Sequence, residues 1–326
     1  MIDLPPTGQP PARIAAIDVA RGGALVAMAI YHFTWDLEFF GYVPAAMTAE
    51  GGWKLFARSI AGSFLFLVGV SLVLAHGKTI RWNVFAKRLA MVAVAALAIT
   101  AASWWFTPDN YIFFGILHSI VVSSLLGLLF LRLPLPLTLA IGLAVILSRP
   151  YLLNPIFNHD FLLWLGLSTV PAHSNDFVPL FPWFGPVLLG IATGKLGVQF
   201  DLIDRLASLY RGTDIVGRTL SLAGRHSLAV YLIHQPILIG IVYLASLIIP
   251  APPSDPIAEF SRSCVRTCVK ENEENFCSRF CRCTLNELVD RDLLGTLMTQ
   301  GQSGKPVEGV QEIVQSCTVS SLPRVD

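Results

Sequence analysis

The stretch "RGGALVAMAIYHFTWDLEFFG", residues 21–41, begins like an ordinary membrane helix and then carries ionisable side chains. Ten uncharged residues separate Arg21 from His32, and Asp36 follows four residues later. Because a helix turns about 100° per residue, Arg21 and His32 project within about 20° of each other, with Asp36 about 60° to one side. The pattern predicts one polar stripe on a transmembrane helix.

The composition indicates a membrane protein. Hydrophobic residues make up 54% of the 326 residues and charged residues only 14%, with a mean hydropathy of +0.62. A soluble domain carries about a quarter charged residues. We predict an all-α, polytopic bundle of about seven spans: 14–34, 55–76, 84–105, 111–131, 134–149, 177–195 and 226–250. The segment 161–170 is too short to cross alone, so it is expected to be re-entrant or to lie at the membrane interface, and an eighth span is the alternative. No basic block interleaved with aromatics occurs, which excludes nucleic-acid binding.

The distribution of Lys and Arg predicts the orientation. Loops 76–88 and 195–225 are rich in both, whereas loop 105–110 has neither and loop 149–176 has only Arg149. By the positive-inside rule, the first two loops and the N-terminus should be cytoplasmic, and the C-terminal tail external. The first span lacks a preceding basic region, so we interpret it as retained and not as a cleaved signal.

A proline-rich linker, "PAPPSDP", residues 250–256, divides the chain into a membrane domain, 1–250, and an external tail, 251–326. The tail contains all the cysteines: Cys264, Cys268, Cys277, Cys281, Cys283 and Cys317. A helical hairpin would set Cys264 opposite Cys281 and Cys268 opposite Cys277, and would leave Cys283 and Cys317 to pair. This is one of 15 connectivities, and a zinc site is the rival interpretation. An oxidising external compartment favours disulfides.

The stripe on the first span permits two interpretations. Arg21 could pair with Asp18 and simply anchor the helix end, and His32 could be a packing residue. However, ionisable side chains inside a span are costly and usually face a cavity or the bundle interior. His32 with Asp36 one turn away also suits general-base chemistry, because a carboxylate stabilises an imidazolium. Asp36 could instead lie in solvent.

The segment "IDVARGGALVAMAIYHF", residues 17–33, resembles the first span of the transmembrane acyltransferase superfamily, with the R-x10-H pattern of acyltransferase family 3. Over residues 11–245 the chain resembles bacterial relatives of heparan-α-glucosaminide N-acetyltransferase. The motifs that carry this resemblance are "SFLFLVGVSLVLAHGK", "FGILHSI", "FPWFGPVLLGIATGK" and "GRHSLAVYLIHQPIL".

The resemblance implies transfer of an acetyl group from cytoplasmic acetyl-CoA to an acceptor across a bacterial cytoplasmic membrane. In the family's lysosomal enzyme the catalytic histidine lies in the loop after the first span, but residues 41–54 contain no histidine. We therefore expect His32 to act instead. The acceptor is left open between a glycan, a lipid headgroup and a polysaccharide, and either N- or O-acetylation would fit.

The remaining candidates follow from depth and helical spacing. His118 lies at a depth from which it could face His32, or it could be a packing residue. Ser227, Tyr231 and His234 share one helix face at i, i+4 and i+7. Arg225 could bind CoA phosphates, whereas Lys78, Arg81, Lys87 and Arg88 are interpreted as topological signals.

The complete set of expectations is as follows. The catalytic candidates are His32, Asp36, His234 and His118, the CoA-binding candidates are Arg21, Arg225, Ser227 and Tyr231, and no metal site is expected. A proton-coupled transporter and a non-catalytic envelope scaffold are the competing functions, and a homodimer is left open.

Overall fold

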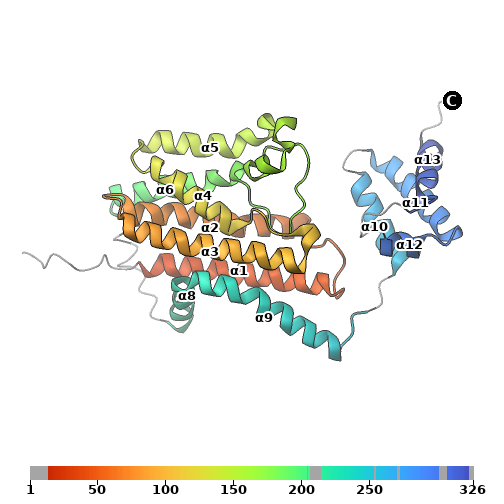
Figure 1. Cartoon of the computed structure of the whole chain (residues 1–326), viewed down its shortest axis with the longest axis horizontal. Helices are drawn as coiled ribbons and strands as arrows, with labels where there is room; N and C mark the ends of the chain where they lie inside the picture. The colour runs from red at the N-terminus through yellow and green to blue at the C-terminus, as the bar shows by residue number, and fades with distance from the viewer. Residues whose placement is uncertain are drawn as a thin grey trace, which may run out of the picture. The chain divides into compact units, whose positions relative to one another are not determined.

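The computed structural model describes residues 14–203, 205, 214–252, 255–269, 272–300 and 307–322, and these ranges contain helices but no strand (Figure 1). The chain forms two compact units. The first comprises Met1–Trp35 with Thr48–Ile241, and the second Asp36–Met47 with Val242–Asp326. Each unit therefore takes part of the first span and part of the last long apolar helix.

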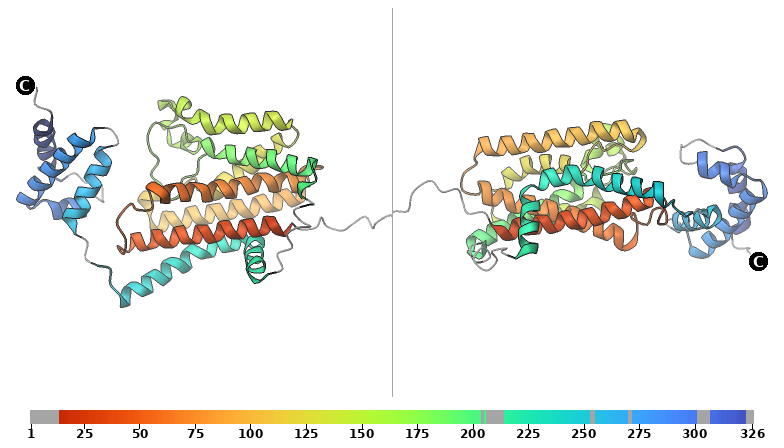
Figure 2. Two further views of the ribbon diagram at one scale, coloured as in Figure 1. Left: turned by 180° about the vertical axis from the view of Figure 1, so that it is seen from behind. Right: turned by 90° about the horizontal axis from the view of Figure 1, so that it is seen from below.

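Within these described ranges, five helices are long and apolar enough to cross a membrane: α1 (Ala15–Phe39), α2 (Gly51–His76), α3 (Trp82–Phe106), α5 (Leu135–Leu152) and α9 (Ser227–Ile248). Two further helices, α4 (Ile116–Phe130) and α6 (Leu180–Gln199), occupy the predicted fourth and sixth spans. The all-α membrane class is confirmed, and the arrangement is compatible with about seven spans. Figure 2 shows α1 and α2 running side by side, and Leu25, Met28 and Ile60 of these two helices form one apolar cluster.

Several helices begin or end at residues that differ from the predicted span boundaries. Helix α1 continues to Phe39, so Asp36 is helical. Helix α4 begins five residues later than predicted, after the short 3-10 helix η1 (Pro108–Asn110). Two further 3-10 helices, η2 (Pro155–Asn158) and η3 (Asp160–Leu165), precede Gly166, whose φ of 81° ends η3. The segment 161–170 is thus no eighth spanning helix.

Glycines set the close packing of α2 against α6. A Cβ added to Gly69 would lie 2.0 Å from the Val187 carbonyl oxygen, and one added to Gly190 would lie 2.1 Å from that of Phe66. The two backbones touch directly, as small residues allow between membrane helices. At the end of α6, Lys195 Nζ donates to the Phe130 carbonyl at 2.6 Å, which ties α6 to the end of α4.

A second close approach joins α1 to α8 (Ile215–Arg225). A Cβ on Gly22 would lie 2.1 Å from the Leu220 carbonyl oxygen, and one on Gly224 would lie 1.8 Å from that of Asp18. Because both glycines lie at backbone contacts, the position of α8 along α1 is closely defined. This crossing brings Arg225, at the end of α8, beside the start of α1.

The second unit contains a disulfide-bonded helical module made of α10 (Pro256–Cys268), α11 (Glu274–Asp290), α12 (Leu294–Gln300) and α13 (Val310–Ser321). Its disulfides join Cys264 to Cys281, Cys268 to Cys277, and Cys283 to Cys317. The connectivity predicted from the two C-x3-C pairs is confirmed.

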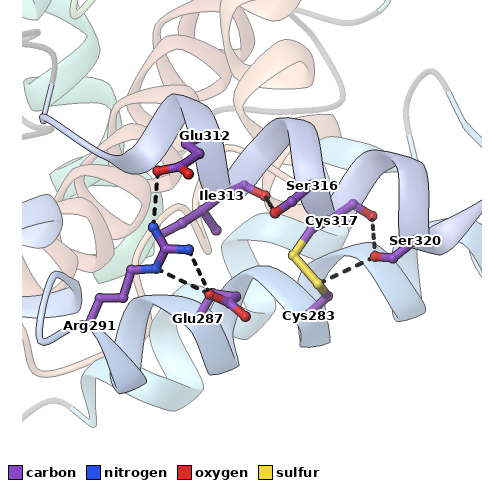
Figure 3. A network of polar contacts seen from close by, with 8 residues as sticks. All are labelled: Cys283, Glu287, Arg291, Glu312, Ile313, Ser316, Cys317 and Ser320. Carbon is purple, nitrogen blue, oxygen red and sulfur yellow. Dashed lines mark hydrogen bonds and ion pairs between the residues drawn. A yellow bond between two sulfur atoms is a disulfide. The ribbon is translucent and has the colours of Figure 1, made fainter.

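The contacts between α11 and α13 complete this module. Leu288 and Ile313 are fully buried between the two helices. Figure 3 shows Arg291 forming ion pairs with Glu287 at 3.1 Å and Glu312 at 3.2 Å beside the Cys283–Cys317 disulfide. Such exposed ion pairs add little, about 0–1 kcal/mol each, so the buried residues and disulfides dominate the module's stability.

Candidate donor cavity and histidine pair

The first unit contains a cavity of about 1470 Å³ between the start of α1, the end of α2, the start of α3, the end of α6 and the α8–α9 junction. One end, here called the basic end, is lined by six Lys and Arg residues against two carboxylates, Asp18 and Asp201. The six are Arg21, Lys78, Arg81, Lys87, Arg88 and Arg225. A cleft lined by one sign of charge attracts ligands of the opposite sign, so the basic end suits an anion.

The other end of the cavity is apolar. It is lined by Phe64, Leu67, Ile116, Leu117 and Tyr231. The cavity follows α2 from Ala75 to Phe64, which is about 16 Å along the helix. A long ligand with an anionic head and a less polar arm matches this distribution of charged and apolar side chains.

Asp18 organises the arginines at the basic end. Its Oδ1 lies 3.2 Å from Arg21 Nη1, and its Oδ2 lies 3.5 Å from Arg225 Nε. Arg21 Nη2 also donates to the Ser71 hydroxyl on α2. The ion pair between Arg21 and Asp18 that was considered from the sequence therefore forms at the start of α1. Both guanidinium groups nevertheless line the cavity, since the Arg21 and Arg225 side chains are 20% and 45% exposed.

The structure brings all four predicted CoA-binding residues to this one cavity: Arg21, Arg225, Ser227 and Tyr231. It also places there the four basic residues that were interpreted only as topological signals. The sequence signal for a cavity-lining cluster, four positive residues within 78–88 and no acid, was interpreted as topology alone.

Two of the predicted catalytic histidines meet in the bundle. The ring centroids of His32 on α1 and His234 on α9 are 5.0 Å apart, in an edge-to-face arrangement. His234 Nδ1 lies 2.6 Å from the Tyr231 carbonyl oxygen. Because a carbonyl only accepts, Nδ1 must carry the proton, and in the neutral ring Nε2 then has a lone pair. That Nε2 is buried and has no hydrogen-bond partner among the described residues. The pair therefore presents an imidazole nitrogen whose lone pair is available.

His118 is engaged elsewhere. Its Nδ1 accepts from the Gly115 N–H at 3.2 Å, and its Nε2 lies 3.2 Å from Thr100 Oγ1. The Thr100 hydroxyl donates to the Ile112 carbonyl, which leaves its oxygen to accept from Nε2. These contacts hold the start of α4 against α3, which is the packing role considered from the sequence.

Asp36 is fully buried, with 0% exposure, so the alternative that it lies in solvent is wrong. It belongs to the second compact unit.

Asp176 is a buried acid that sequence analysis missed. It lies in the loop before α6, and its Oδ2 accepts from the Ile116 N–H at 2.9 Å at the start of α4. Burial raises the pKa of this carboxyl to about 6, against the opposing effect of the backbone hydrogen bond. It also interacts electrostatically with Tyr231.

Taken together, the fold and these residues define a membrane-embedded helical protein with a cavity that is lined at one end by basic side chains and with two histidines in contact inside the bundle. The family model described as "Heparan-alpha-glucosaminide N-acetyltransferase, catalytic" matches residues 13–236. The chain belongs to this family of acetyltransferases, and the match includes every predicted site residue. Among curated proteins and among solved structures, none matches the chain. Within the described residues, no group of three His, Cys, Asp or Glu residues could hold a metal ion.

Proposed function

We propose that the protein binds acetyl-CoA in the cavity and transfers its acetyl group to a hydroxyl or amine of an envelope glycan or glycolipid on the opposite side of the membrane. The observation that carries this proposal is the pairing of α1 with α9. On α1 the cavity-lining Arg21 is followed by His32, and the cavity-lining Arg225, at the end of α8, is followed by His234 on α9. The separation on α1 is about 16 Å, roughly half the hydrocarbon thickness of a bilayer.

The donor fits the cavity by charge and size. CoA carries phosphates, which arginine guanidinium groups bind through paired hydrogen bonds. The volume of about 1470 Å³ exceeds the roughly 300–1,000 Å³ of ordinary small-molecule pockets, as a ligand of this length requires. We place Arg21, Arg225 and Ser227 at the head of CoA, with its arm running toward Tyr231. The positive-inside rule then favours a cytoplasmic basic end and an N-terminus inside.

The chemistry is a direct acyl transfer. His32 takes the proton of the acceptor hydroxyl or amine as the acceptor atom forms a bond to the thioester carbonyl carbon. The carbon–sulfur bond breaks, and the departing thiolate receives the proton from the imidazolium. Asp36, one helical turn along α1, is the carboxylate that we assign to stabilising this imidazolium, and His234 is the second base. Transfer through an acetyl-histidine is the alternative route.

The test uses the purified full chain in lipid vesicles. Acetyl-CoA is supplied with glucosamine as the amine probe or with envelope polysaccharide as the hydroxyl probe, and both free CoA thiol and acetylated product are measured. We expect product in the wild type. His32→Ala should lower transfer by about 10²–10⁴-fold while acetyl-CoA binding changes little.

The matched control is His173→Ala, because His173 is an exposed histidine in the loop before α6. If His32→Ala transfers acetyl normally in folded protein, the base is another residue, and His234→Ala is the next variant. If the wild type binds no acetyl-CoA, the acyltransferase proposal is wrong and the transporter or scaffold function takes its place.

A further inference from the structure

The cavity does not reach the two histidines. Its lining on α1 ends at Arg21, and its lining on α9 ends at Tyr231. Neither His32 nor His234 is among the described residues that line it. Tyr231 is therefore the cavity-lining residue of α9 that lies nearest in sequence to the histidine pair, with His234 about one helical turn farther along.

The ring of Tyr231 lies beside that of His234. The ring centroids of Tyr231 and His234 are 5.7 Å apart. Tyr231 also packs against three apolar clusters, which are formed by α1 with α2, by α3 with α4, and by the main core around α2 and α6. A side chain held by this many helices blocks the direct way from the cavity to the histidines.

We infer that Tyr231 is a positioning residue that separates the bound thioester from the histidine pair until its ring moves aside. This inference rests on the proposed acetyl transfer. The same residue also acts through its backbone, because its carbonyl accepts from His234 Nδ1 and so directs the Nε2 lone pair away from this carbonyl.

Keeping the thioester apart from the histidine pair has a chemical use, because water competes with the acceptor for the thioester carbonyl carbon. If the thioester lay beside a basic imidazole, water could attack its carbonyl carbon. The carbon–sulfur bond would break, the water proton would pass through the imidazole to the thiolate, and acetate and CoA would be released. While no acceptor is bound, the Tyr231 ring keeps the thioester away from the histidines and so slows this hydrolysis.

The test measures CoA thiol released from acetyl-CoA without any acceptor. Tyr231→Ala should raise this release at least about tenfold over the wild type, a small part of the about 10²–10⁴-fold that a positioned base contributes. Tyr231→Phe keeps the ring, and its release should lie far below that of Tyr231→Ala. Adding His32→Ala and His234→Ala to Tyr231→Ala should return the release to the wild-type rate.

The matched control is Tyr243→Ala, since Tyr243 lies on the same helix with 53% exposure and does not line the cavity. If Tyr231→Ala does not fold, Tyr231→Leu opens the barrier with less loss of volume. The inference is wrong if a folded Tyr231 variant binds acetyl-CoA but releases CoA no faster than the wild type. A wild type that binds no acetyl-CoA would instead overturn the proposed function.

Discussion

Replacing Gly22 with alanine tests whether the α1–α8 crossing positions the arginines of the basic end. The new Cβ would lie 2.1 Å from the Leu220 carbonyl oxygen. Real Cβ atoms essentially never approach closer than 3.0 Å, so α8 must move away by about 1 Å. The Arg225–Asp18 pair at 3.5 Å would then exceed ion-pair distance. A movement of this size also displaces the Arg225 guanidinium from a phosphate.

The expected loss can be estimated from one charged hydrogen bond. Such a bond contributes about 1.5–3 kcal/mol, which corresponds to about 10- to 100-fold weaker acetyl-CoA binding. Overpacking should also destabilise the fold by about 1–3 kcal/mol. Calorimetric titration with acetyl-CoA measures the first effect and thermal unfolding the second.

Gly23→Ala is the matched control. Gly23 neighbours Gly22 on α1, but a Cβ there meets nothing within 4 Å. This variant should bind acetyl-CoA like the wild type and should be slightly more stable, because alanine favours a helix. Equal binding by Gly22→Ala and Gly23→Ala would refute the role of the crossing in placing Arg225.

Three further predictions concern other parts of the chain. A C-terminal reporter that works only outside the cell should be active, and the same reporter in loop 195–225 inactive; the reverse pattern would contradict the orientation. Denatured, non-reduced protein should have no reactive thiol, and reduction should expose six; stoichiometric zinc would contradict the disulfides. Asp176→Asn removes a carboxyl whose pKa rises from 3.8 to about 6 on folding. The folded wild type holds this proton more tightly, so its stability relative to the variant should fall by about 2 kcal/mol from pH 4 to pH 6. If the difference in unfolding temperature between the wild type and Asp176→Asn does not change with pH, the pKa of Asp176 is not raised by folding.

The sequence alone determined the features that depend on local periodicity. Apolar runs of about 20 residues predict membrane helices whatever surrounds them. Helical pitch alone predicted that Arg21 and His32 share a face of α1. It also predicted the pairing of Cys264 with Cys281 and of Cys268 with Cys277, because two C-x3-C pairs facing each other across a hairpin match one turn each.

Only the tertiary structure decided which faces meet. His32 and His234 lie in the first and last long apolar helices of the chain, and nothing local in either helix predicts their 5.0 Å contact. The sequence likewise did not predict that Lys78 and Arg88 line the cavity, or that His118 contacts Thr100. The physical reason is that a helix's own period orients its side chains about its axis, whereas its neighbours are selected by packing. Here the decisive contacts are backbone approaches at glycines such as Gly22, which carry no periodic signal.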